Sequence, residues 1–300
     1  MAFRPRPPRR RPQARPRRAP ERTIHLPTRM NRLDARFARL AADGRKALIP
    51  FFTAGDPSLE ATVPVMHALA AAGADVIELG VPFSDPMADG PTIQRSSERA
   101  LARGGGPRHV IEAVRVFRER DADTPVVLMG YLNPVEIRGA EAFAAAAAGA
   151  GVDGVLLVDL PPEESAELRE AFSAHGLALI LLASPTSDAA RLERLCADAA
   201  GYLYYVSFAG VTGASERLDT QAAGERLRAI RARAGVPVVA GFGIRDAAGA
   251  AAMAQEADGV VVGSALVAAL AEAGDTAEAA RRAADFLAPL RAGLDAAGAG

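Results

Sequence analysis

Eight short apolar segments recur along this chain, and their recurrence limits the possible folds more than any other feature. They begin near residues 47, 75, 125, 154, 177, 201, 237 and 259. Each is almost wholly aliphatic or β-branched, which is typical of strands buried on both faces of a sheet. Stretches rich in Ala, Arg and Glu with helical spacing separate most of them. The pattern predicts parallel strands joined by crossover helices.

The number of segments favours a closed barrel over an open sheet. Eight such units fit a single (β/α)8 TIM barrel, a fold that typically needs roughly 250 residues. An open doubly wound sheet is the alternative, although no Gly-x-Gly-x-x-Gly turn follows the first segment. The intervals after strands 2 and 6 are long, at 50 and 36 residues. We expect extra structure there, above the strand ends where barrels hold their active sites.

Residues 1–29 differ in composition from the rest of the chain. They contain ten Arg, seven Pro, one Glu and no Lys, whereas the whole chain has a formal net charge of −1. We interpret them as a disordered leader, or as sequence upstream of a start at Met30, and residues 30–300 as the catalytic barrel domain. A basic tail that contacts nucleic acid or an anionic membrane is the alternative.

Composition also limits compartment and cofactor. The longest uncharged apolar stretch falls short of the roughly 18 residues that a membrane span needs. The single cysteine, Cys196, excludes an intramolecular disulfide and fits a reducing cytoplasm. No spacing of His, Cys or carboxylate residues argues for a metal site. We therefore expect a cytoplasmic protein without a metal.

Acidic residues on and after the second segment are the candidate catalytic groups. Glu78 lies inside an otherwise apolar strand, where burial would raise its pKa and favour acid/base chemistry. Asp85 and Asp89 follow in a proline-rich loop. A glutamate that points outward, and aspartates that merely form turns, are the alternatives.

Glycine-bearing turns follow three successive strands, at residues 207–213, 241–243 and 263–264. Backbone amides after strands 7 and 8, with a short following helix, often bind phosphate in barrels. Glycines that simply permit tight turns are the alternative. Together, these residues predict a barrel enzyme that acts on a small phosphorylated molecule by carboxylate chemistry.

Seven stretches resemble, in order, motifs of the tryptophan synthase alpha chain: PFFTAGDPSLE, ELGVPFSDPMADGPTIQ, LMGYLNPV, VDLPPEES, YYVSFAGVTG, GFGI and VVGSALV. They extend from about Ile49 to Val267. The resemblance implies a lyase of L-tryptophan biosynthesis that cleaves indole-3-glycerol phosphate to indole and glyceraldehyde 3-phosphate by a retro-aldol reaction. It also implies that this chain uses no cofactor.

The resemblance assigns roles to individual residues. Glu78 would be the acid/base, and Asp89 would bind the indole N–H. The indole pocket, the mobile loop after strand 6 and the phosphate site would be formed by Phe51, Tyr204, Phe242, Thr212, Gly213, Gly243, Gly263 and Ser264. Tyr131 is a further candidate for the pocket wall. Ala209 stands where the family often has a hydroxyl residue, so a hydrogen bond within this loop would be missing.

The resemblance further implies a partner, a beta chain that holds pyridoxal phosphate (PLP), in an alpha2beta2 heterotetramer. Asp85 and Pro161 match positions at that interface.

Other interpretations of the function stay open. A related phosphate barrel, such as an indole-glycerol-phosphate synthase, would usually use a lysine on a strand, and Lys46 is the only evident candidate. A non-catalytic subunit that activates its partner, or a nucleic-acid binder acting through its tail, is the other alternative.

Overall fold

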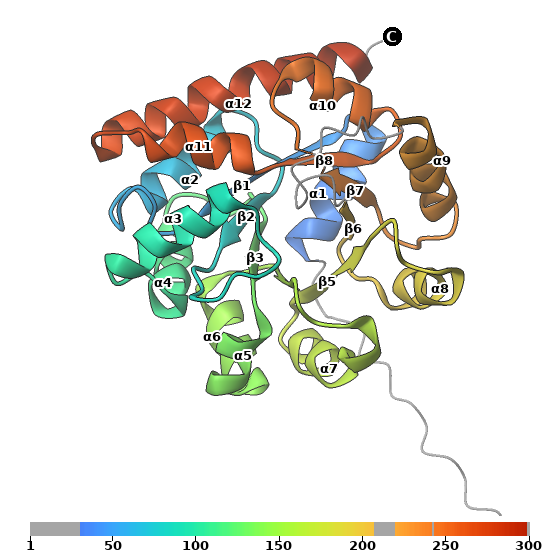
Figure 1. The fold of residues 1–300 in the computed structure, drawn as a ribbon, viewed down its shortest axis with the longest axis horizontal. Coiled ribbons are helices and arrows are strands. Elements are labelled where there is room, and N and C mark those ends of the chain that lie inside the picture. The colour runs from blue at the N-terminus through green and yellow to red at the C-terminus, as the bar shows by residue number, and fades with distance from the viewer. Residues whose placement is uncertain (1–30, 207–219, 242, 299–300) are drawn as a thin grey trace, which may run out of the picture.

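The strands close into a barrel. The structure is a computed structural model that describes residues 31–206, 220–241 and 243–298. All eight strands are parallel and pair in chain order, and the last pairs with the first (Figure 1). The predicted TIM barrel is confirmed and the open sheet was wrong. Every strand begins within two residues of its predicted start: β1 (Ala47–Thr53), β2 (Ile77–Gly80), β3 (Val126–Gly130), β4 (Gly154–Leu157), β5 (Ala178–Ala183), β6 (Leu203–Val206), β7 (Val238–Gly241) and β8 (Gly259–Val262).

Two-sided burial explains why these strands are apolar throughout. All residues of β1, β2, β4 and β8 are buried, because side chains point alternately into the barrel and toward the surrounding helices. The helices form the outer ring: α2 (Thr62–Ala71), α3 (Pro91–Ala102), α4 (Pro107–Arg118), α5 (Leu132–Arg138), α6 (Ala140–Ala150), α7 (Ala166–Ala174), α8 (Ala189–Asp198), α9 (Thr220–Arg231), α10 (Ala247–Ala254) and α11 (Ser264–Ala271).

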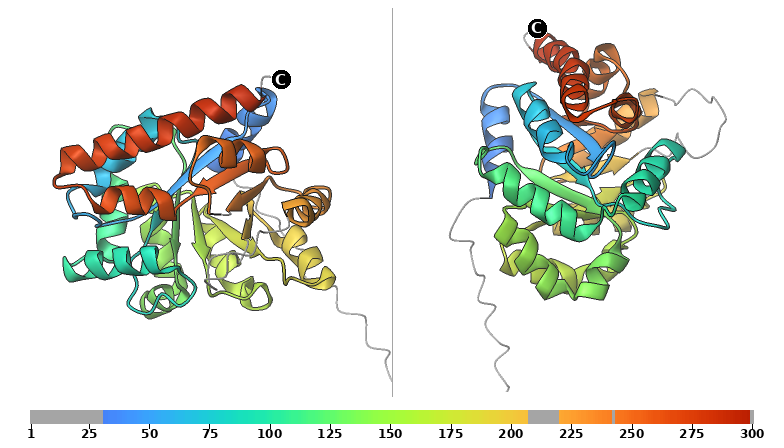
Figure 2. Two further views of the ribbon diagram at one scale, coloured as in Figure 1. Left: turned by 45° about the horizontal axis from the view of Figure 1, so that its top comes forward. Right: turned by 90° about the vertical axis from the view of Figure 1, so that its left-hand side faces the viewer.

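The structure adds two helices that the sequence analysis did not expect. Helix α1 (Arg32–Ala42) precedes the first strand, and α12 (Thr276–Gly298) follows the last unit and lies against α2 and α10 (Figure 2). Leu33 of α1 packs where β4 and β6 begin, beside Gly154 and Gly201. Helix α1 therefore covers the end of the barrel at which the strands start.

The expected extra structure after strand 2 is confirmed, since a long loop and both α3 and α4 separate β2 from β3. The corresponding expectation after strand 6 falls largely on residues 207–219, which lie outside the described residues, as does the leader at residues 1–29. A short 3-10 helix, η1 (Pro162–Glu164), follows β4.

Two features are absent from the described part of the chain. None of its helices combines the length and the apolar character needed to cross a bilayer. Within the same residues, no three His, Cys, Asp or Glu side chains are grouped in a way that would hold a metal ion.

Candidate active site

Glu78 is the most deeply buried carboxylate of the site. It is the second residue of β2, in register with Phe51 of β1, and it is completely buried. One oxygen, Oε1, accepts a hydrogen bond of 2.5 Å from the Tyr202 hydroxyl, whereas Oε2 has no hydrogen-bond partner among the described residues. Burial raises the pKa of Glu78 to about 7, although the bond from Tyr202 lowers it. The carboxyl can therefore gain or lose a proton near neutral pH, as an acid/base catalyst must.

The two tyrosines near Glu78 remain protonated. Tyr202 and Tyr204 come from the beginning of β6 and are buried inside the barrel. Burial and the charge of Glu78 raise the pKa of both hydroxyls well above the usual value. Tyr202 thus donates its hydrogen bond to Glu78 at every pH at which the chain would work. The sequence analysis missed Tyr202, whose only signal was a hydroxyl at the start of an apolar strand.

Asp89 is held by Tyr131 across the loop that follows β2. The Tyr131 hydroxyl donates to Asp89 Oδ2 at 3.0 Å and accepts from the backbone N–H of Ala88, also at 3.0 Å. Gln94 donates to the backbone oxygen of Asp89 and ties the loop to α3. Burial raises the pKa of Asp89 to about 6, and the bond from Tyr131 opposes that rise. Asp89 is therefore largely ionised at neutral pH.

Phe51, Asp89 and Tyr131 line one small cavity at the carboxyl ends of β1 to β3, together with Gly80. Gly80 makes room for the Phe51 ring, because a Cβ there would lie 2.9 Å from two ring carbons. The ring of Phe83 stacks on Tyr131 from the loop side, with centroids 4.9 Å apart. Aromatic faces and a single carboxylate suit a flat apolar ring that carries one N–H group.

The structure does not bring every candidate to this cavity. Glu78 and Tyr204 do not line it, because the carboxylate of Glu78 is bonded to Tyr202 in the barrel interior. Glu78 is nevertheless next to the cavity, since its register partner Phe51 forms one wall. A change of its side-chain rotamer would be needed for it to touch a ligand there.

The described residues of the turns after β7 and β8 include three candidates for the phosphate site. Gly243 has a φ of +63°, a conformation that favours glycine. Ser264 begins α11, and the N-cap residue Gly263 has no side chain with which to cap the first amides. These amides face the same barrel end as the cavity, because they follow a strand's carboxyl end. The candidates Thr212, Gly213 and Phe242, and the substituted position Ala209, lie outside the described residues.

The two candidate interface residues lie in loops at that same end. Asp85 follows β2, is exposed and accepts a 2.5 Å hydrogen bond from the Ser84 hydroxyl. Pro161 is half-buried between β4 and η1. Met87, which the sequence analysis did not single out, is 82% exposed beside Asp85. Methionine is enriched in the cores of protein interfaces relative to the rest of the surface.

Comparisons with known proteins identify the family of this chain. A family model described as "Tryptophan synthase alpha chain" matches residues 37–293. The tryptophan synthase alpha chains of Xanthomonas axonopodis pv. citri and Xanthomonas oryzae pv. oryzae (strain MAFF 311018) are each 74% identical to this chain. The alignments cover 89% of this chain and 99% and 100% of those proteins.

Solved structures give the same result. The crystal structure of tryptophan synthase subunit alpha from Legionella pneumophila str. Paris superposes with a TM-score of 0.83 at 44% identity, over 89% of this chain and all of that one. A ligand-free tryptophan synthase structure from M. tuberculosis superposes with a TM-score of 0.79 at 38% identity, over 88% of this chain and 99% of that one. By sequence and by fold, this chain belongs to the tryptophan synthase alpha chain family.

Proposed function

We propose that this chain is a lyase that cleaves indole-3-glycerol phosphate to indole and glyceraldehyde 3-phosphate in tryptophan biosynthesis. The observation that carries the proposal is Glu78, a fully buried carboxyl with a pKa of about 7 and one oxygen without a partner among the described residues. It lies beside an aromatic cavity that contains a second carboxylate, Asp89. Membership of the family supports the same reaction.

The proton balance of the cleavage requires only one acid/base group. Protonated Glu78 gives its proton to carbon C3 of the indole ring, and positive charge develops on the ring nitrogen. The resulting carboxylate takes the proton of the side-chain hydroxyl. The bond between C3 and the side chain then breaks, its electron pair restores the indole ring, and the hydroxyl carbon becomes the aldehyde. Glu78 ends the cycle protonated, as it began.

Asp89 stabilises the intermediate. Its carboxylate accepts a hydrogen bond from the indole N–H and lowers the energy of the positive charge that develops there. The bond from Tyr131 fixes the orientation of this carboxylate before the substrate arrives. Thr212, on the loop after β6, would pair with Asp89 when that loop closes.

The remaining candidates bind the substrate. The aromatic side chains Phe51, Tyr131, Tyr204 and Phe242 would exclude water from the indole ring. The phosphate would be bound by backbone amides and a hydroxyl from Gly213, Gly243, Gly263 and Ser264. The uncapped start of α11 and the left-handed Gly243 support this placement.

We further propose that the chain works in the cytoplasm with a tryptophan synthase beta chain that holds PLP, as an alpha2beta2 assembly. Asp85 and Pro161 would contact the partner. The exposed side chain of Met87, in the loop between the two carboxylates, supports a docking face at this end of the barrel. A partner seated there would cover the mouth of the active site.

The lysine-dependent alternative loses its support. Lys46 is the only lysine of the 300 residues. It lies just before β1, at the barrel end where the strands begin and away from the cavity that holds Asp89. An aldolase mechanism through a lysine imine at this active site therefore has no residue to perform it.

The proposal is tested by measuring indole release from indole-3-glycerol phosphate by the full chain, alone and with a tryptophan synthase beta chain. We expect release in the parent and a loss of about a hundredfold or more in Glu78→Gln. Glu112→Gln is the matched control, because Glu112 is exposed on α4, where it pairs with the exposed Arg115. No release by the parent under either condition would overturn the proposed reaction, and an active Glu78→Gln would overturn the role of Glu78.

A further inference from the structure

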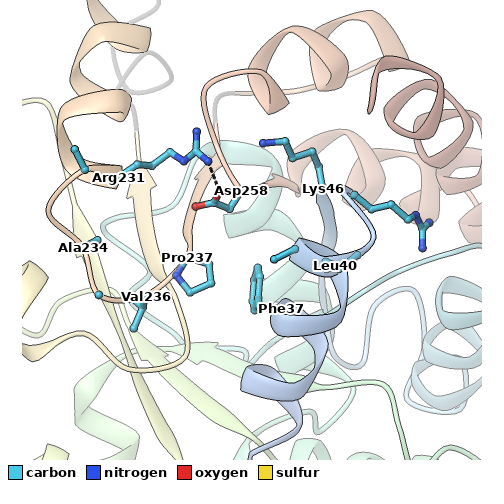
Figure 3. Close-up of a pocket in the computed structure, with 13 residues that line it drawn as sticks. Phe37, Leu40, Lys46, Arg231, Ala234, Val236, Pro237 and Asp258 are labelled. Carbon is cyan, nitrogen blue, oxygen red and sulfur yellow. Dashed lines mark hydrogen bonds and ion pairs between the residues drawn. The ribbon is translucent and has the colours of Figure 1, made fainter. Parts of the chain in front are cut away.

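A second, larger pocket lies at the opposite end of the barrel, where the strands begin. Its volume is about 710 Å³, within the range of roughly 300 to 1,000 Å³ that is common for small-molecule sites. It lies between α1 and the turn that joins α9 to β7 (Figure 3). It is lined by Lys46, which precedes β1, and by Asp258, which precedes β8, among others. None of the residues that line it also lines the active-site cavity.

One part of this pocket is apolar. Phe37 and Leu40 of α1 face Val236 and Pro237 of the turn before β7. Phe37 and Leu40 are almost fully buried, whereas Val236 and Pro237 are half-buried. Val236 and Pro237 therefore offer most of the accessible apolar surface, against which a flat or aliphatic group can pack.

The other part is positively charged. Lys46 and Arg231 extend toward one another from the two sides of the pocket, above Asp258 (Figure 3). Asp258 is fully engaged, since one oxygen pairs with Arg231 at 2.5 Å and the other accepts the backbone N–H of Val238 at 2.9 Å. Lys46 donates to the backbone oxygen of Ala257 at 2.7 Å, and among the described residues no carboxylate pairs with it.

Lys46 is therefore a cation of the pocket that has no ion-pair partner among the described residues. Arg45, a further cation that lines the pocket, donates two hydrogen bonds to Asp295, which also pairs with Arg291. Burial and the nearby charge of Arg231 lower the pKa of Lys46, and the smaller effects of the Asp258 and Glu256 charges do not outweigh them. An ammonium has three donors, and within the described part of the chain one hydrogen bond from Lys46 is seen, to Ala257.

We propose that this pocket binds a small organic anion with an apolar body, whose carboxylate, sulfonate or phosphate group pairs with Lys46 beside Arg231. An anion supplies the charge and the acceptors that Lys46 lacks, and its apolar body fills the space between Phe37 and Pro237. The arginine-rich residues 1–29 are the wrong occupant, because their charge has the same sign as that of Lys46.

The test uses two fluorescent probes with the same rings. Anilinonaphthalene sulfonate carries an anion, and phenylnaphthylamine lacks it. We expect the sulfonate to bind the full chain at one saturable site, and Lys46→Met to weaken that binding about tenfold, the equivalent of one charged hydrogen bond. Binding of the neutral probe is expected to stay unchanged.

Arg103→Met is the matched control, because it removes one exposed cation from the end of α3, outside the pocket. It should leave the binding of both probes unchanged. Equal binding of the sulfonate by the parent and Lys46→Met would overturn the proposal, since the probe would then lie elsewhere, for example in the active-site cavity. An absence of saturable binding would overturn it as well.

A second measurement needs no variant. Because Lys46 is the only lysine, the masses of the peptides obtained by digestion after limited acetylation report separately on two amines, Lys46 and the chain's α-amino group. We expect saturating sulfonate to slow acetylation of Lys46 at least severalfold, whereas the α-amino group serves as the internal reference. Equal acetylation of Lys46 with and without the probe would contradict the proposed contact.

Discussion

At the scale of single residues, the acid/base properties of the active site depend on how far its two carboxylates are removed from water. Glu78 and Asp89 are both protonated more readily than ordinary acids, and in both cases desolvation is the main cause. Each is also held by one tyrosine, Tyr202 or Tyr131, whose hydrogen bond favours the ionised form. In each of the two carboxyls, burial therefore raises the pKa and the hydrogen bond from one tyrosine lowers it.

This tuning predicts a bell-shaped pH dependence of kcat/KM for indole release. Asp89 acts ionised, so activity should rise as the pH passes about 6; Glu78 begins the cycle protonated, so activity should fall as the pH passes about 7. Tyr202→Phe removes the bond that lowers the pKa of Glu78, and should move only the alkaline limb to higher pH. Tyr131→Phe, the reciprocal control, should move the acid limb. Limbs that stay in place in both variants would contradict this assignment.

Glu78 should also make the free energy of unfolding depend on pH. Its folded pKa of about 7 lies above the ordinary 4.5, so the folded state holds the proton more tightly. The stabilisation is fully present below the unfolded pKa and is lost as the pH rises through about 7. Glu78→Gln stays neutral, so its stability relative to the parent should increase by about 2 to 3 kcal/mol between about pH 5 and about pH 8.

Urea unfolding of the parent and of Glu78→Gln at the two pH values measures this difference. Glu112→Gln serves again as the control, because its exposed carboxylate should show no comparable increase. The same stability difference at both pH values would mean that Glu78 is not desolvated in solution.

At the scale of elements, one arrangement recurs where the strands begin. An aspartate just before β2, β4 and β8 accepts the backbone N–H of a residue at the start of the preceding strand and pairs with an arginine from a helix. The three aspartates are Asp75, Asp153 and Asp258, and the amides belong to Leu48, Val126 and Val238. Each aspartate thus joins two neighbouring strands to a helix, which sets their relative height in the barrel.

Asp153 is the clearest case for a test. It is 3% exposed and bonds Arg118 of α4 at 2.8 Å, Arg32 of α1 at 2.9 Å and the amide of Val126. Asp153→Ala leaves a buried guanidinium and a buried amide without their partner, and should lower the free energy of unfolding by about 3 to 5 kcal/mol. Thermal or urea unfolding measures the loss.

Asp285→Ala is the matched control. Asp285 is 65% exposed on α12 and pairs with the similarly exposed Arg281, so its loss should cost less than about 1 kcal/mol. Similar losses in the two variants would show that burial of the aspartate is not what makes the contact strong.

At the scale of the whole molecule, the barrel holds together only if the last strand meets the first. Ala47 of β1 and Gly259 of β8 are register partners at this closure. A Cβ at Gly259 would lie 2.6 Å from the Cβ of Ala47 and 2.9 Å from its backbone oxygen. The closure therefore requires the smallest residue at position 259.

Gly259→Ala should accordingly lower the free energy of unfolding by about 1 to 3 kcal/mol, because neither strand can move without breaking the barrel. Gly149→Ala is the control. Gly149 lies exposed on α6 with open space at its Cβ position, so the same substitution should stabilise the chain by roughly 0.5 to 1 kcal/mol. Unfolding midpoints that move in the same direction would contradict the closure argument.

Local sequence was enough for most of the fold. Strand positions follow from runs of apolar residues because two-sided burial acts on each strand separately, and all eight were located within two residues. Helix α1 was missed although its apolar residues have helical spacing, because it lies outside the repeated unit. Helix α12 contains Pro289, a residue that normally ends helices, and its position depends on packing against α2 and α10.

The active site, too, could be predicted from the sequence only in part. Glu78 and Asp89 were visible as charges in and after an apolar strand, whereas the resemblance to a family was needed to give them roles. Tyr202 was missed because it is 124 residues from Glu78 in sequence, and only closure of the barrel brings the two together. The opposite pocket was likewise invisible, since α1, α9 and the starts of β1, β7 and β8 form it jointly.

The sequence by itself determined the order and type of the elements, because hydrophobic periodicity and turn residues act over a few neighbouring positions. Only the tertiary structure decided which groups are buried together, and hence the pKa values of Glu78 and Asp89 and the unpaired charge of Lys46. The physical reason is desolvation: the cost of a charge depends on every atom around it, and in a closed barrel those atoms come from distant parts of the chain.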